Sequence, residues 1–158
     1  MDKNWPLVDR VAFAALIVLI ALAIYAYAVM PATIPTSFGY NGTPQAYGPK
    51  SQLFLQPGIA AFLWIVFAVV LKNPGRLILP FKVPPERLKS VMAMSDATTR
   101  LIRAEIVVAL IVFEGMMIQS ARLGSAVLGF SAAPVALLGA VLGTAAVFML
   151  GAWRIARG

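Results

Sequence analysis

Few residues of this 158-residue chain are of types that do acid–base, nucleophilic or metal chemistry. The chain has no Cys and no His, which excludes disulfides and the thiolate and imidazole ligands of the commonest metal sites. Two acids, Glu105 and Glu114, interrupt an apolar stretch, but nine positions on a helix place them about half a turn apart. They therefore form no paired-carboxylate site. We find no phosphate-binding loop or nucleophile–base set, and we expect neither an enzyme nor a cofactor or metal site.

Glu114 is the residue whose surroundings most need an explanation. A charge in hydrocarbon costs roughly 2.5 kcal/mol or more, so such a residue faces a bundle interior, pairs with another group or takes up a proton. Tyr25 lies at a matching depth on another apolar segment, which favours a hydrogen bond between Tyr25 and Glu114. Arg122 is long enough to reach the same carboxylate. A satisfied polar pair is the first interpretation, and a proton or ligand site is the alternative.

Four apolar segments are long enough to hold these residues in a membrane. Of the residues, 61% are hydrophobic and 12% charged, and the mean hydropathy is +0.87. A soluble domain of this size could not bury so much apolar surface. Backbone groups in hydrocarbon must be satisfied within the segment, so spans of this length form helices. We therefore predict an all-α fold, one membrane domain over residues 1–158 with spans at 11–30, 52–71, 101–119 and 134–153.

The positive charge predicts the orientation of these spans. Of the 13 Lys and Arg residues, only Lys50 and Arg122 fall on the side opposite the termini. The positive-inside rule then places both termini and the basic loop 72–100 in the cytoplasm, as expected for a multi-pass protein of a bacterial inner membrane. This topology accounts for the net charge of +7, so we expect anionic lipids at the cytoplasmic face and no nucleic acid as partner. A cleavable signal peptide is the alternative for the first span, whose apolar run is long for one.

The predicted outer loop, residues 31–51, is rich in prolines, glycines and aromatic residues. Proline stiffens the chain and glycine permits turns, while Asn41 followed by Gly42 is a strong turn signal. This composition predicts a folded cap on the membrane surface rather than a flexible linker. The cap is either a compact connector between two spans or a recognition surface for a ligand outside the cell.

The same loop resembles the signature of SdpI-like membrane proteins, which follows a first transmembrane helix. The matching residues are Met30, Pro31, Ile34, Pro35, Phe38, Gly42, Pro44, Tyr47, Gly48 and Lys50. The resemblance implies a non-enzymatic membrane protein whose best-known relative gives immunity to a secreted toxin peptide and recruits a transcriptional repressor. This chain has Ser37 where the family commonly has His and Gln45 where it has Asp, and it has four spans where the full immunity protein is longer.

Two further segments carry predicted contacts. In the basic loop 72–100, Pro85 can open a helix at its first turn, and Asp96 and Arg100 are spaced as an i, i+4 ion pair. In the last span, Gly139 and Gly143 are small residues four apart, which permits close helix approach. Packing within the chain is the first interpretation for this glycine pair, and contact with a second subunit is the alternative.

Three functions agree with these observations. The first is SdpI-like recognition, immunity or signalling through the outer loop, with an extracytoplasmic peptide as ligand. The second is an accessory structural subunit that contacts other membrane subunits. The third is a small proton-coupled transporter that uses Glu114.

Overall fold

The computed structural model describes residues 7–39, 43–72, 82–127 and 132–157, apart from the side chain of Ala133. This part of the chain is mostly helical. Its elements are α1 (Leu7–Val29), β1 (Thr33–Phe38), β2 (Pro44–Pro49), the short 3-10 helix η1 (Lys50–Phe54), α2 (Leu55–Lys72), α3 (Pro85–Leu123) and α4 (Ala133–Arg157).

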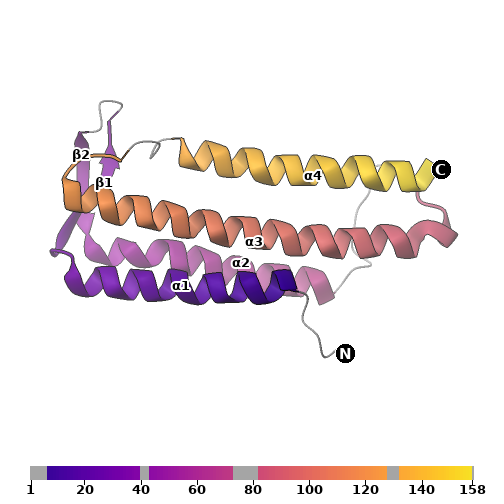
Figure 1. Cartoon of the computed structure of the whole chain (residues 1–158), viewed down its shortest axis with the longest axis horizontal. Coiled ribbons are helices and arrows are strands. Elements are labelled where there is room, and N and C mark those ends of the chain that lie inside the picture. Colours follow the sequence, from indigo (N-terminus) through magenta and orange to yellow (C-terminus); the bar gives the residue numbers. More distant parts are fainter. Residues whose placement is uncertain (1–6, 40–42, 73–81, 128–131, 158) are drawn as a thin grey trace.

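The helices run side by side along one axis, and the two strands lie at one end of the bundle (Figure 1). The opposite end holds the N-terminal ends of α1 and α3 and the C-terminal ends of α2 and α4. Helix α3 lies between the other helices, with α1 and α2 on one side and α4 on the other. Helix α4 therefore packs mainly on α3.

The expected all-α fold is wrong in one segment, because the residues after α1 form a β-hairpin. Strands β1 and β2 pair antiparallel, with Ile34 opposite Gly48 and Pro35 opposite Tyr47. Residues before a proline are pushed to extended conformations, and a two-stranded sheet has only edge strands, where prolines are tolerated. The proline-rich composition that predicted a cap thus produces extended strands. The predicted turn at Asn41 and Gly42 lies outside the described residues.

Helix α1 packs through a regular seam. Its buried residues recur at alternating spacings of three and four: Asp9, Ala12, Leu16, Leu19, Ala23 and Ala26. This is the period of helices that pack nearly parallel with interlocking side chains. Residues of α3 meet the seam in two clusters, since Val107 joins Leu16 and Leu19 while Met117 and Ile118 join Ala26.

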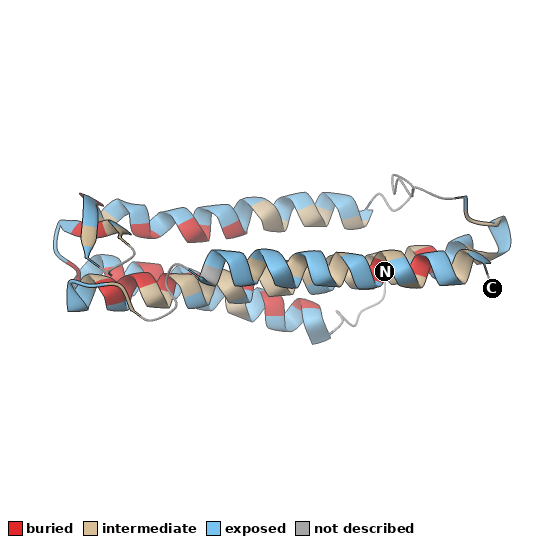
Figure 2. Ribbon diagram, turned by 90° about the horizontal axis from the view of Figure 1, so that it is seen from above, coloured by how far each residue is buried: buried red, intermediate tan, exposed pale blue. Residues whose placement is uncertain are grey.

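Within the described residues, three helices are long and apolar enough to cross a membrane, at Leu7–Val29, Lys50–Lys72 and Pro134–Arg157. Exposed residues cover most of their outward surface (Figure 2). An apolar surface this extensive requires lipid as its solvent, so the chain is a multi-pass membrane protein.

Helix α3 is not among these three helices, although it contains the predicted span 101–119. It begins at Pro85, as the sequence indicated, and continues without a break to Leu123. Residues 85–100, predicted as part of a loop, therefore extend the helix beyond the start of α1. Its apolar part also carries Arg103, Glu105 and Glu114, which lower the hydropathy. The left-handed backbone of Gly124 ends it, with φ of 66°.

Candidate functional site

The hairpin is fastened to the bundle by its apolar face. Ile34 of β1 and Leu53 of η1 are fully buried and pack with Met30, Met117 and Ile118. This cluster joins the hairpin, α1 and α3 in one core. The hairpin is therefore a rigid cap on one end of the bundle, which is a suitable scaffold for a binding surface.

Gly48 allows the close packing of β2 on η1. A Cβ atom at this position would lie 2.7 Å from Nε2 of Gln52 and 3.0 Å from the Thr36 methyl group. The missing side chain leaves room for these neighbours. A larger residue at this position of the predicted recognition loop would have to displace the Gln52 and Thr36 side chains.

Lys50 has an equally structural environment. Its Nζ donates a hydrogen bond to the carbonyl oxygen of Tyr27 at 2.9 Å and lies 4.4 Å from the centroid of the Tyr27 ring. Carbonyl groups in the last turn of a helix lack intrahelical partners, and a cation there complements the helix dipole. Lys50 therefore caps the C-terminal end of α1, while Phe54 packs on the Tyr27 ring at 5.3 Å.

The remaining residues of the predicted recognition loop differ in exposure. Tyr47 is the most prominent, with 66% of its surface exposed, and Gln45 and Ala46 beside it are also exposed. Of the other predicted residues, Pro31 is exposed, Phe38 and Pro44 are half-buried and Pro35 is buried, while Gly42 lies outside the described residues.

Glu114 lies in the core below the cap. It is fully buried, and neither carboxylate oxygen has a hydrogen-bond partner in the described part of the chain. The predicted hydrogen bond with Tyr25 is not formed, because Tyr25 is 55% exposed and turns outward. Arg122 does not reach the carboxylate either, since its guanidinium lies 6.0 Å from the centroid of the Tyr25 ring.

Gln56 of α2 is a second buried polar side chain in this layer. Its Nε2 donates to Sδ of Met117 at 3.7 Å, and its Oε1 has no partner among the residues that the structure describes. Met117 lies one turn beyond Glu114 on the same face of α3. The core under the hairpin thus holds buried oxygen atoms of both Glu114 and Gln56 that lack donors. Gln56 was missed in the sequence because an amide at the start of a span carries no charge signal.

An ionic cluster closes the opposite end of the three-helix core. Asp9 of α1 is buried and forms ion pairs with Arg100 and Arg103 of α3. The guanidinium of Arg103 also stacks over the Trp64 ring of α2 at 4.1 Å. Arg100 thus pairs with Asp9 rather than with Asp96, its predicted partner. The buried position of Asp9 could have been predicted from its spacing, because it lies three residues before Ala12 in the row of residues that α1 buries.

Helices α3 and α4 contribute one more polar contact. The Thr144 hydroxyl donates to Oε1 of Glu105 at 2.6 Å, whereas Oε2 of Glu105 has no partner among the described residues. A Cβ atom on Gly139 or Gly143 would meet nothing within 4 Å, so these glycines do not make the close helix approach that their spacing predicted.

Comparison with protein families adds one finding. Residues 14–61 match a domain of unknown function, DUF1648, which is found in SdpI-like membrane proteins. The match covers most of α1, the hairpin, η1 and the first turns of α2, and it ends before α3. Comparisons with curated proteins and with solved structures gave no match. The matched residues thus include the hairpin and η1, whereas Met117 and Ile118 of α3, which complete the core under the cap, lie outside the match.

Proposed function

We propose that this chain is a non-enzymatic SdpI-like protein of a bacterial inner membrane, which recognises an extracytoplasmic peptide through its hairpin and acts in immunity or signalling. The observation that carries the proposal is that some residues in and next to the hairpin anchor it to the helices while another is exposed. Ile34, Gly48 and Lys50 fasten it to the helices, and Tyr47 is left exposed. A rigid cap that presents an aromatic side chain has the features of a binding surface.

The proposed topology has four spans with both termini in the cytoplasm. This proposal is supported by the bundle's arrangement, because the first residues of α1 and the last residues of α4 both lie towards the end opposite the hairpin (Figure 1). Arg100, Arg154 and Arg157 belong to the terminal end, where anionic lipid headgroups would meet them. Helix α3 serves as the third span, since its charged residues Arg103 and Glu114 face the bundle and are buried.

Labelling tests the topology, because the chain contains no cysteine of its own. A Thr43→Cys variant should react with a membrane-impermeant maleimide added outside intact spheroplasts. A Lys89→Cys variant should react only after the membrane is opened. Labelling of position 43 from the cytoplasmic side alone would overturn the orientation.

Substitution of Tyr47 tests recognition. Cells that express the chain are challenged with secreted antimicrobial peptides, and protection is measured as the change in inhibitory concentration. We expect Tyr47→Ala to lose protection. The matched control is Phe62→Ala, because this aromatic residue is also 66% exposed but lies on α2, outside the hairpin. Equal protection by both variants, at equal expression, would remove the exposed hairpin surface from the mechanism.

The accessory-subunit function is favoured by α4, which packs mainly on α3 and leaves Val135, Leu138 and Val147 exposed. Stoichiometric copurification of other subunits in mild detergent would support it over recognition. Proton-coupled transport is favoured by the buried oxygens of Glu114 and Gln56 that lack donors. A Glu114→Gln variant that retains flux would eliminate transport.

A further inference from the structure

Helices α3 and α4 leave between them a cavity that is open to the outside of the bundle, and no hairpin residue lines it. Its volume is about 490 Å³, which lies within the range of small-molecule sites. Apolar side chains form most of the wall. The lining residues that matter for its chemistry are Met94, Leu101, Glu105, Gly143, Thr144 and Phe148.

Glu105 gives this cavity one charged group. It is the only ionisable residue among those that line the cavity. The Thr144 hydroxyl occupies Oε1, and Oε2 is buried without a donor among the described residues. Once the carboxylate turns towards the cavity that Glu105 lines, this oxygen can accept a charge-assisted hydrogen bond.

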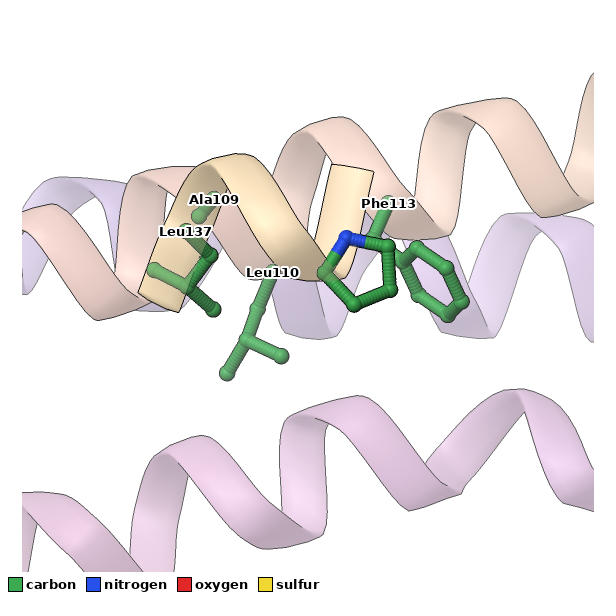
Figure 3. A pocket seen from close by; sticks show the side chains of 5 residues that line it. Ala109, Leu110, Phe113 and Leu137 are labelled. Atoms are coloured by element: carbon green, nitrogen blue, oxygen red, sulfur yellow. The ribbon is translucent and has the colours of Figure 1, made fainter. Parts of the chain in front are cut away.

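The volume beside the carboxylate is free of side chains. Gly139 and Gly143 border it, and a Cβ atom on either would meet nothing within 4 Å. A second apolar cavity of about 180 Å³ lies further along the same two helices (Figure 3). Its walls are Ala109, Leu110, Phe113, Pro134 and Leu137. The second cavity lies beyond Glu105 towards the C-terminal end of α3, so a hydrocarbon chain that starts at Glu105 finds apolar walls in that direction.

We propose that the α3–α4 cavity binds a small amphipathic primary amine. Its ammonium group donates to Oε2 of Glu105, and its hydrocarbon chain lies against the apolar walls. The choice follows from charge complementarity, because an ammonium supplies both the missing donor and the missing positive charge. An anionic headgroup would be repelled, and a neutral alcohol would leave the carboxylate without a counter-ion. The site is independent of the hairpin and of the proposed recognition.

The experiment measures binding of radiolabelled dodecylamine to the full chain in nanodiscs of zwitterionic lipid. Empty nanodiscs give the background from partition into lipid. We expect saturable binding of one amine per chain, and dodecanol should compete at least about tenfold less well, because a hydrogen bond between two charged groups is stronger than a neutral one. Absence of saturable binding above the background, or equal competition by dodecanol, would overturn the proposal.

Two variants with matched controls assign the binding to the cavity. Glu105→Gln keeps the shape of the side chain and should weaken binding at least about tenfold, whereas Glu86→Gln, on an exposed position of the same helix, should not. Gly143→Leu fills the cavity and should abolish binding. Its control is Gly58→Leu on α2, where a Cβ atom also meets nothing within 4 Å.

Each result decides for or against the site. Unchanged binding in Glu105→Gln or Gly143→Leu would overturn it. If a second copy of the chain fills the cavity instead, the original protein shows no saturable amine binding and Gly143→Leu changes the oligomeric state in detergent. Loss of protection in Tyr47→Ala with normal amine binding would show that the two sites are separate.

Discussion

Glu105 and Glu114 lie on the same helix, yet the structure around them differs. Glu114 is fully buried in the packed core that α1, α2 and α3 form under the hairpin, and both of its oxygens lack donors. Glu105 is half-buried beside the α3–α4 cavity, where Thr144 satisfies one of its oxygens. The same side chain is therefore enclosed by tight packing in one region and borders open space in the other.

This difference shows that α3 separates a tightly packed side of the molecule from a loosely packed one. On one side, the seam of α1 and the cap give α3 a continuous apolar contact, which the short side chains Ala23 and Ala26 permit. On the other side, α4 touches α3 mainly where Val91 packs with Phe148 and Ala152, near the N-terminal end of α3. The three-helix core is built for rigidity, and the α3–α4 contact leaves volume for a ligand.

Asp9 gives the largest expected effect in the packed region. Asp9→Asn should reduce the free energy of unfolding by about 3–5 kcal/mol, because Arg103 is 5% exposed and would lose its carboxylate. Unfolding by SDS titration of mixed micelles, followed by circular dichroism, measures it. The control is Asp96→Asn, a half-buried acid without an ion pair in the described chain.

A double variant sharpens this test. Because replacing a buried ion pair by apolar residues is often neutral, Asp9→Leu combined with Arg103→Leu should recover part of the lost stability. If Asp9→Asn is no less stable than Asp96→Asn, then the ionic cluster does not hold α1 against α3.

Leucine truncations compare the two sides of the bundle directly. Leu19→Ala should cost about 2–5 kcal/mol, because Leu19 is fully buried in the three-helix core and its loss leaves a cavity. Leu142→Ala on α4 should stay within about 0.5 kcal/mol, since Leu142 is exposed on the outside. The same SDS titration applies to both variants. Similar losses at the two positions would contradict the division into a packed and an open side.

Substitution by leucine should have different effects on stability at the two glutamates. Glu114→Leu should raise the free energy of unfolding by about 1–3 kcal/mol, because it removes two buried acceptors that have no donors. Glu105→Leu should bring no such gain, because it breaks the hydrogen bond from Thr144. A destabilised Glu114→Leu variant would mean that the carboxyl group has a partner when the protein is in lipid.

Much of this arrangement could be predicted from the sequence. Hydropathy indicated the apolar helices, and Pro85 marked the start of α3. The proline-rich loop indicated a cap, but not its strands, because the pairing of Ile34 with Gly48 depends on contacts across the hairpin. The continuity of α3 was missed because the charged residues before residue 101 were interpreted as a loop between two spans. Charged residues do not prevent a helix from extending beyond the membrane.

The polar contacts were harder to predict for a physical reason. Depth along a span can be counted from residue numbers, and on that count Tyr25 and Glu114 matched. The orientation of each helix about its own axis cannot be counted from residue numbers in the same way, and in the structure this orientation turns Tyr25 outward. Asp9 and Thr144 find their partners on other helices, at separations that no local spacing predicts. A row of buried residues with alternating spacings of three and four indicates which face of a helix points to the core. In α1, Asp9 belongs to such a row.

Thr144 gives the smallest expected effect and probes the open region alone. Thr144→Val keeps the shape of the side chain and removes the hydroxyl that bonds Oε1 of Glu105, so it should cost about 1 kcal/mol. The control is Thr99→Val, which removes a hydroxyl bonded at 2.9 Å to the Ser95 carbonyl oxygen one turn back in its own helix. Because that carbonyl already accepts a hydrogen bond within the helix, Thr99→Val should lose less stability than Thr144→Val.

A double-mutant cycle completes the comparison between the two glutamates. Thr144→Val combined with Glu105→Leu should show a coupling energy of at least about 0.5 kcal/mol, because the two groups share one hydrogen bond. The same threonine variant combined with Glu114→Leu should be additive within about 0.5 kcal/mol, since Glu114 faces the other side of α3. Coupling to Glu114 of equal size would mean that the packed core and the cavity respond as one unit, and the division of the molecule along α3 would fail.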